Sequence, residues 1–193
     1  MIFTADHGEW LGDHGLLLKG PMPCEGLLRV GMIARGPGIP AGRVVDDPVG
    51  TLDLAPSFLD WAGVALTAPL HSASLLPLIQ GEEKGGREVA LSEWELLPAR
   101  TDVPLSLRVA RGRGWKLSLE LRSGAGELYD LVADPHEMVN RFGDPACADA
   151  QAVLEAAIHA RPEDARHSAC RWALPEAGRQ YGELTQASPV NSA

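Results

Sequence analysis

Four strand-like runs follow one another between residues 88 and 131, and they constrain the fold of the chain more than any other feature does. The runs cover residues 88–94, 105–111, 115–121 and 127–131. Glycine-containing turns of a few residues separate the last three runs. Connections this short join neighbouring antiparallel strands, whereas parallel strands need a long crossover. The sequence therefore predicts a small antiparallel sheet.

The segments on either side of this sheet have a different character. Residues 149–160 are rich in alanine, which has the highest helix propensity, and predict a helix. Residues 161–193 mix proline, serine, glycine and charge without periodicity, which predicts a loosely ordered tail. Residues 82–87 are polar and glycine-rich and predict a link. We therefore expect three parts, covering residues 1–81, 88–145 and 146–193.

The first part combines strand and helix signals. Residues 1–4 are short and apolar and suit a strand, and residues 29–35 predict a buried strand that ends at a Gly-Pro-Gly breaker. Residues 51–62 place apolar side chains at helical spacing and are followed by Gly63, a helix stop. The pattern indicates an α/β arrangement.

Asp6 and His7 directly follow the first predicted strand, where functional groups often lie in α/β sheets. A carboxylate beside an imidazole offers oxygen and nitrogen ligands to a divalent ion, and Gly8 permits a sharp turn. Lys19 supplies a compact positive charge for a sulfate or phosphate oxygen. The tripeptide alone is too short to be specific, and it favours the alternative in which Asp6 caps the next short helix and His7 lies on the surface.

The wider segment favours the metal-binding interpretation, because residues 3–38 resemble the sulfatase branch of the alkaline phosphatase superfamily. The matching pieces are Phe-Thr-Ala-Asp6-His7-Gly8, Leu-Gly-Asp-His14-Gly15-Leu, Lys19-Gly-Pro, Glu25-Gly-Leu-Leu-Arg29-Val and Ile33-Ala-Arg-Gly36-Pro37-Gly38. Weaker matches are Ser74-Leu-Leu-Pro77, Trp115-Lys116-Leu, and Glu127-Leu-Tyr129-Asp130-Leu131 with Asp134, Pro135, Glu137 and Asn140. The likeness covers residues 2–145.

The resemblance implies the fold class. It implies the C-terminal part of an alkaline phosphatase-like α/β/α sandwich, followed by a small antiparallel β-sheet subdomain with a C-terminal helix. It also implies that the first strand lies inside a mostly parallel sheet, with neighbours from a missing N-terminal part. A parallel sheet without its neighbours exposes apolar faces and unpaired edges. We therefore expect the chain to associate with that N-terminal part or with itself as a homo-oligomer.

The resemblance also implies the site residues and the cofactor. Asp6 and His7 match the positions that bind the catalytic divalent metal, and Lys19 matches the lysine that contacts the transferred group. Calcium is the expected metal, with manganese or zinc as alternatives because an imidazole suits them better. The implied activity is metal-dependent hydrolysis of a small anionic ester, a sulfate ester. Histidine after the aspartate also occurs in phosphonate and phosphodiester hydrolases, so that alternative stays open.

Two features of the family are missing from this chain. Its nucleophile lies in a Cys/Ser-x-Pro-x-Arg motif, but no cysteine or serine here is followed by x-Pro-x-Arg. The early paired aspartates that complete the family's metal site are also absent. We therefore assign no catalytic nucleophile and expect the 193-residue chain to bind metal weakly and to be inactive alone. A non-catalytic remnant or interaction module is the alternative function.

The repeated Asp13-His14 pair and Cys24 are predicted to have structural roles. Asp13 and His14 repeat the Asp-His-Gly pattern, but the glycines around them argue against one helical face shared with His7. We expect Asp13 and His14 to hold the loop together rather than to bind metal. Cys24 stands where the family often has an aromatic residue, and we expect a small buried side chain.

Composition excludes several classes of protein. A net charge of −9 argues against nucleic-acid binding, which requires a basic face. No apolar run approaches the roughly twenty residues that cross a membrane, so we expect no membrane contact. Three irregularly spaced cysteines predict neither a disulfide framework nor a zinc knuckle. No signal peptide is visible, so the expected location is the cytoplasm.

Overall fold

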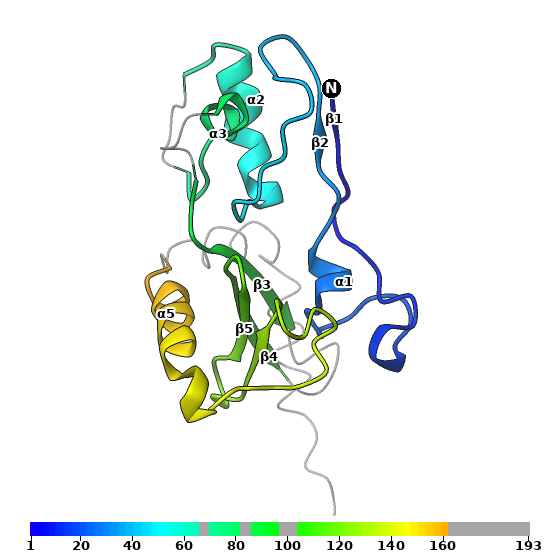
Figure 1. Cartoon of the computed structure of the whole chain (residues 1–193), viewed down its shortest axis with the longest axis vertical. Helices are drawn as coiled ribbons and strands as arrows, with labels where there is room; N and C mark the ends of the chain where they lie inside the picture. The colour runs from blue at the N-terminus through cyan, green and yellow to red at the C-terminus, as the bar shows by residue number, and fades with distance from the viewer. Residues whose placement is uncertain (66–69, 82–85, 97–103, 162–193) are drawn as a thin grey trace, which may run out of the picture.

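The computed structural model of the chain describes residues 1–65, 70–81, 86–96 and 104–161. Two lobes lie one above the other in Figure 1, an upper lobe of short strands and helices and a lower lobe built on one sheet. Most of the predicted link and nearly all of the predicted tail, residues 82–85 and 162–193, lie outside the described residues. The three-part division of the chain stays a prediction.

The lower lobe contains a four-stranded antiparallel sheet in the order β3-β4-β5-β6. The strands are β3 (Ala90–Leu96), β4 (Leu105–Arg111), β5 (Trp115–Glu120) and β6 (Gly126–Asp130). In the centre of the sheet, Leu117 of β5 lies opposite Ala110 of β4 and Leu128 of β6. The four predicted strands are confirmed, and their ends move by no more than two residues.

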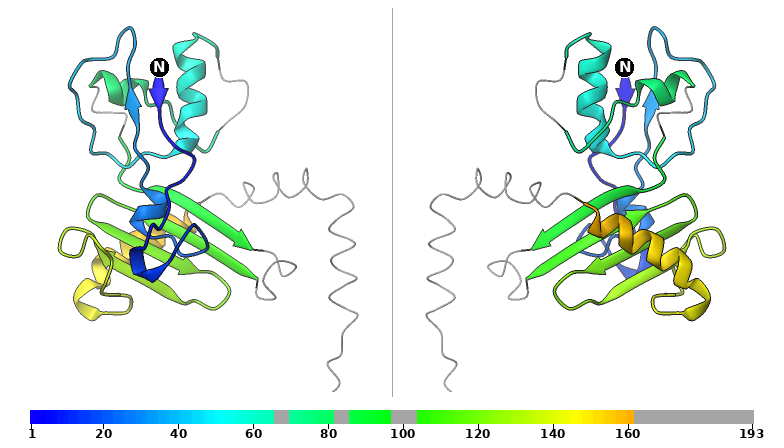
Figure 2. Two further views of the ribbon diagram at one scale, coloured as in Figure 1. Left: turned by 90° about the vertical axis from the view of Figure 1, so that its right-hand side faces the viewer. Right: turned by 90° about the vertical axis from the view of Figure 1, so that its left-hand side faces the viewer.

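One face of this sheet is covered by the helix α5 (Ala148–His159) (Figure 2). A short 3-10 turn, η4 (Pro145–Cys147), leads into the helix. Leu154 and Ile158, one helical turn apart, pack against Leu117 and Leu119 of β5. The predicted helix is therefore confirmed with a one-residue shift, and burial of this apolar stripe is what attaches it to the sheet.

The opposite face of the sheet carries the chain between residues 8 and 28, which we call the site loop (Figure 2). The loop contains a 3-10 turn, η1 (Asp13–Gly15), and ends in the short helix α1 (Glu25–Leu28). Trp10, Cys24 and Leu27 form a buried cluster that also contacts Trp94 of β3. Cys24 is 5% exposed, as expected from the sequence. The sheet is thus the middle of three layers.

The upper lobe starts with two very short strands, β1 (Ile2–Phe3) and β2 (Ile33–Ala34). They pair antiparallel, with Phe3 opposite Ile33, so the parallel neighbours implied by the resemblance are not among the described strands. The prediction of a buried strand over residues 29–35 is wrong, since only two residues pair and Ile33 is 63% exposed. Among the described strands, β2 pairs only with β1, which is itself two residues long, so no further residues of 29–35 join a sheet.

Two helices complete the upper lobe, α2 (Leu54–Trp61) after the turn η2 (Thr51–Asp53), and α3 (Leu76–Gln80). The fully buried carboxylate of Asp53 accepts hydrogen bonds from the amides of Gly50, at 2.8 Å, and Ala73, at 3.2 Å. It also pairs with Arg87, just before β3. Asp53 therefore ties the two helices to the start of the sheet. None of the described helices has the length and apolar character needed to cross a membrane.

Candidate metal half-site

Asp6 and His7 lie where the chain leaves β1 and enters the site loop. Asp6 is exposed, and its Oδ1 accepts a hydrogen bond from the His7 amide at 3.0 Å. This bond, with help from its own amide and the neighbouring imidazole, lowers the pKa of Asp6 below its usual value. The carboxylate is therefore kept in the ionised form that binds metal.

His7 is oriented by the residue that follows it. Its Nδ1 lies 2.7 Å from the Gly8 carbonyl oxygen. A carbonyl oxygen only accepts, so Nδ1 carries the proton in the neutral ring and Nε2 presents a lone pair. That Nε2 lies 3.7 Å from Oδ2 of Asp6. Two neighbouring ligands of one ion, each roughly 2.0–2.5 Å away from it, lie about 3–4 Å apart. Asp6 and His7 thus fit a shared divalent cation.

Lys19 acts electrostatically on Asp6. Its positive charge is the last of the influences that lower the pKa of Asp6. The segment that leads to Lys19 is fixed by Trp10, whose amide donates to Leu18 at 3.0 Å and whose indole donates to Met22 at 3.1 Å. An exposed cation therefore accompanies the two candidate metal ligands.

Gly8 has a different role from the one expected. Its φ lies outside the left-handed region, so the turn itself does not require glycine. The requirement comes from packing, because a Cβ at this position would lie 2.0 Å from the carbonyl oxygen of Gly26. The Gly8 amide donates to the carbonyl of Leu27 at 2.8 Å. The residue next to His7 is therefore in direct backbone contact with α1.

His14 belongs to another group of side chains. Its ring lies with Cys24 and Glu137 so that one potential ligand atom from each falls within 4.8 Å of the others. Glu137 already pairs with the buried ammonium of Lys116, and a second cation beside that charge would be repelled. Within the described ranges, no third acidic, histidine or cysteine side chain joins Asp6 and His7 in such a group. Asp6 and His7 are therefore candidates for only half of the ligands that a metal site requires.

Sequence reasoning missed the group around Glu137. Glu137 stands in a family signature, and His14 in a repeated motif, but nothing in either pattern places them together. The contact depends on the path of the site loop over the sheet. The one available signal was Lys116 itself, between the large apolar residues Trp115 and Leu117, because a lysine that becomes buried needs a partner.

Comparison with known proteins identifies a family that this chain matches. The family described as N-sulphoglucosamine sulphohydrolase, C-terminal, matches residues 12–164. A Delta 4,5-hexuronate-2-O-sulfatase from Bacteroides thetaiotaomicron is 31% identical over 176 residues, which are 86% of this chain and 36% of that protein. The family match begins inside the site loop, at residue 12, and extends over the whole sheet.

Solved structures show the same likeness. A 2-O GAG sulfatase has a TM-score of 0.73 and 32% identity, over 86% of this chain and 37% of its own. A phosphonate monoester hydrolase of Agrobacterium radiobacter has a TM-score of 0.70 and 29% identity, over 81% of this chain and 33% of its own. The chain thus spans about a third of the length of these proteins.

Proposed function

The chain belongs to the sulfatase family, and we propose that it supplies the metal-binding and anion-binding side of a hydrolase that cleaves sulfate esters. The observation that carries this proposal is the pair of ligand atoms, Nε2 of His7 and Oδ2 of Asp6, which lie 3.7 Å apart. An ionised carboxylate, an oriented imidazole and an ammonium together suit a metal ion and an anionic ester.

Each side chain has a defined part in the proposed reaction. Asp6 and His7 hold the ion, while the Gly8 carbonyl keeps the imidazole in the tautomer that binds it. Asp6 and His7 would hold a divalent ion, which would supply Lewis-acid polarisation of the ester and charge stabilisation for the attacking oxygen. Lys19 balances the charge on the transferred sulfate group. We propose calcium as the metal, with manganese and zinc as the alternatives that the imidazole of His7 allows.

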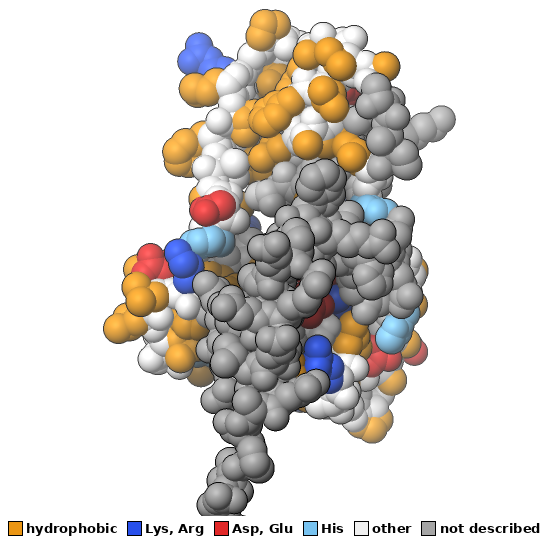
Figure 3. Space-filling view, turned by 180° about the vertical axis from the view of Figure 1, so that it is seen from behind, with side chains coloured by type: hydrophobic (Ala, Val, Ile, Leu, Met, Phe, Trp, Pro, Cys, Tyr) orange, Lys and Arg blue, Asp and Glu red, His pale blue; other side chains and the backbone are white. Residues whose placement is uncertain are grey.

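We propose that the rest of the site comes from the N-terminal part of a sulfatase polypeptide. The matched proteins are almost three times as long as their matched region, and this chain contains no Cys/Ser-x-Pro-x-Arg motif. Exposed apolar side chains gather on the upper lobe (Figure 3). They include Phe3, Ile33, Val44, Leu52 and Phe58. A clustered apolar surface of this kind marks a protein contact, and an α/β partner would cover it.

Metal titration of the purified chain tests the half-site directly. We expect Mn²⁺, followed by its electron paramagnetic resonance signal, to bind weakly at one site. Asp6→Asn and His7→Ala should each weaken binding by at least about tenfold, as loss of a ligand or its support does. The matched controls, Asp46→Asn and His136→Ala, change exposed groups elsewhere and should leave binding unchanged. Equal affinity in all five proteins would exclude Asp6 and His7 as ligands.

Hydrolysis of a phosphodiester or phosphonate monoester is the second candidate function. It is favoured by the imidazole at position 7 and by the structural likeness to a phosphonate monoester hydrolase. A longer protein that carries this sequence together with the nucleophile motif, assayed with 4-nitrophenyl sulfate and with a phenylphosphonate ester, separates the two. A higher kcat/KM for the sulfate supports the first proposal, and the reverse order supports the second. No turnover of either ester by the metal-loaded protein would favour a non-catalytic module.

A further inference from the structure

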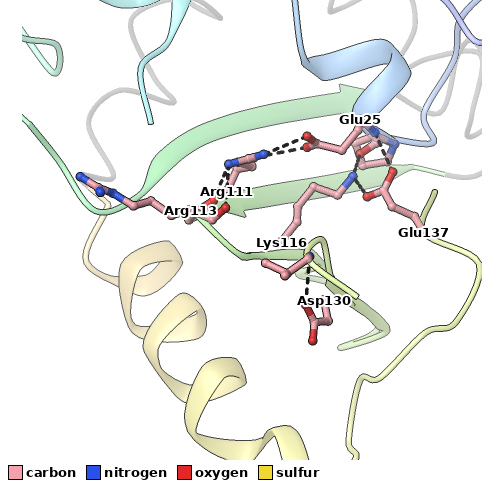
Figure 4. A network of polar contacts seen from close by, with 9 residues as sticks. Glu25, Arg111, Arg113, Lys116, Asp130 and Glu137 are labelled. Atoms are coloured by element: carbon pink, nitrogen blue, oxygen red, sulfur yellow. Dashed lines mark hydrogen bonds and ion pairs between the residues drawn. The ribbon is translucent and has the colours of Figure 1, made fainter. Parts of the chain in front are cut away.

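Two buried charged side chains lie outside the half-site, and the proposed function gives them no role. Lys116 points from β5 toward the site loop, and its side chain is 1% exposed. It forms an ion pair with Glu137, whose side chain is 3% exposed (Figure 4). Burying both charges removes them from water, and such a pair often stabilises a protein no more than an apolar pair would. Stability alone therefore does not explain their presence.

Both side chains also bind the backbone of the site loop. The ammonium of Lys116 donates to the carbonyl oxygen of Pro23 at 2.6 Å. Oε2 of Glu137 accepts from the amide of Glu25 at 2.6 Å. Apolar side chains of the same size would fill the space but leave these two polar groups without their partners. The charged pair thus fixes residues 23–25, where α1 begins.

The carboxylate of Glu25 gives the start of α1 a further attachment. Its Oε2 lies 3.0 Å from Nη2 of Arg111, the last residue of β4. Figure 4 shows Arg111 and Lys116 approaching α1 from neighbouring strands of the sheet. A helix of four residues has little stability of its own, so its position is set by these contacts.

From α1 the contact continues to the half-site. Leu27 accepts the hydrogen bond from Gly8, and the carbonyl of Gly26 lies against the Cα of Gly8. His7 is the residue immediately before Gly8 in the chain. A displacement of α1 therefore moves the backbone that orients the imidazole, because there is no flexible side chain between them.

Backbone strain indicates that the loop needs such an external support. Leu11, His14 and Leu18 have φ values of 50°, 53° and 66°, and Glu137 has 56°. Non-glycine residues are unfavourable in this left-handed region and persist there when surrounding contacts determine the conformation. The site loop and the residue that holds it are both strained in this way.

We propose that Lys116 and Glu137 are positioning residues, which fix α1 and through it the orientation of Asp6 and His7. The ligand role of Asp6 and His7 in this inference rests on the proposed function. Lys116 and Glu137 lie in two separate stretches that resemble sulfatase signatures, Trp115-Lys116-Leu and Asp134-Pro135 with Glu137 and Asn140. The structure joins these stretches in one contact, and the contact leads to the metal half-site.

Amide hydrogen exchange of the whole chain, measured by NMR, tests this inference without any metal. In Glu137→Gln and in Lys116→Met, the Gly8 amide should exchange about 10- to 100-fold faster, as expected when buried hydrogen bonds are removed. The amides of Leu117 and Leu128 in the sheet core should keep their protection. Arg113→Gln removes an ion pair with Asp47 at the turn between β4 and β5 and should change neither set.

Broadening of the His7 ring resonances by Mn²⁺ provides a second readout, and we expect it to weaken in both variants. Equal loss of protection at Gly8 and at Leu117 would mean that the pair only stabilises the fold and would overturn the inference. Unchanged Gly8 protection in either folded variant would also overturn it.

If Lys116→Met does not fold, the exchange measurement on the nearly isosteric Glu137→Gln tests the inference by itself. Absence of Mn²⁺ binding to the wild-type chain counts against the proposed function, while the exchange measurement still decides the positioning role.

Discussion

The backbone of Gly8 touches the backbone of Gly26, and this contact sets the residue after His7 directly against α1. A Cβ on Gly8 would lie 2.0 Å from the Gly26 carbonyl oxygen, far inside the distance that two such atoms tolerate. The carbonyl belongs to the backbone and has no rotamer through which to move away. The Asp-His-Gly motif therefore requires its glycine for close packing.

Gly8→Ala should consequently displace α1 or the turn that carries His7. We expect a loss of about 1–3 kcal/mol in the free energy of unfolding, typical of overpacking, together with weaker Mn²⁺ binding. Urea unfolding and the Mn²⁺ titration measure the two effects. Gly31→Ala is the matched control, because nothing lies within 4 Å of a Cβ there. If Gly8→Ala behaves like Gly31→Ala, the close contact is not a constraint in solution.

Glu120, at the end of β5, should make the fold sensitive to acid. Hydrogen bonds from the Ser123 side chain, and from the amides of Ser106 and Ser123, lower its pKa from 4.5 to about 2. Between these values the unfolded chain binds more protons than the folded chain at this position. The stability from Glu120 is therefore fully present above the unfolded pKa and is lost as pH falls through the folded pKa.

Urea unfolding followed from neutral pH down to acid tests this prediction. In Glu120→Gln the free energy of unfolding should be lower at neutral pH and should change less between the two pKa values. Glu9→Gln, which alters an exposed carboxylate on the site loop, should leave the slope of the wild type intact. A slope that is the same in Glu120→Gln and the wild type would contradict the assignment.

The elements that the sequence predicted well are those with local signals. The turns around Gly112 and Gly124 fix where β4, β5 and β6 begin and end, and alternation places Leu117 and Leu119 on one face of β5. The helix α5 follows from its alanine content and apolar stripe. Each signal lies within the element itself, so the sequence alone was sufficient.

The elements predicted poorly depend on distant parts of the chain. Ile33 has the sequence context of a buried strand, but its only described partner strand is β1, and the side chain remains exposed. The pairing of Lys116 with Glu137 spans 21 residues and the whole of β6, and the link from Lys116 to Pro23 spans 93 residues. For the site, Asp6, His7 and Lys19 came from a resemblance, while the contacts that orient them came only from the structure.

Asp53→Ala should disrupt the upper lobe. The buried carboxylate satisfies the amides of Gly50 and Ala73 and pairs with Arg87, and its removal leaves all three without their partner. We expect a loss of about 3–5 kcal/mol, as for other broken buried pairs. Thermal unfolding measures the total, and exchange at the Ala73 amide reports the local effect. Asp60→Ala removes one exposed hydrogen bond to Ser74 and should change stability by less than about 0.5 kcal/mol.

The apolar surface of the upper lobe should make the chain associate in solution. Phe3 and Ile33 are 65% and 63% exposed on paired strands, and water is removed from both when any protein covers them. We expect the chain alone to form concentration-dependent oligomers in sedimentation velocity. Replacing both residues by serine should raise the dissociation constant at least about tenfold, since each buried apolar side chain contributes more than about 1 kcal/mol. Val132→Ser with Met138→Ser changes exposed apolar groups of the lower lobe and serves as the control. A wild-type chain that stays monomeric and melts in one sharp transition would show that this surface needs no partner.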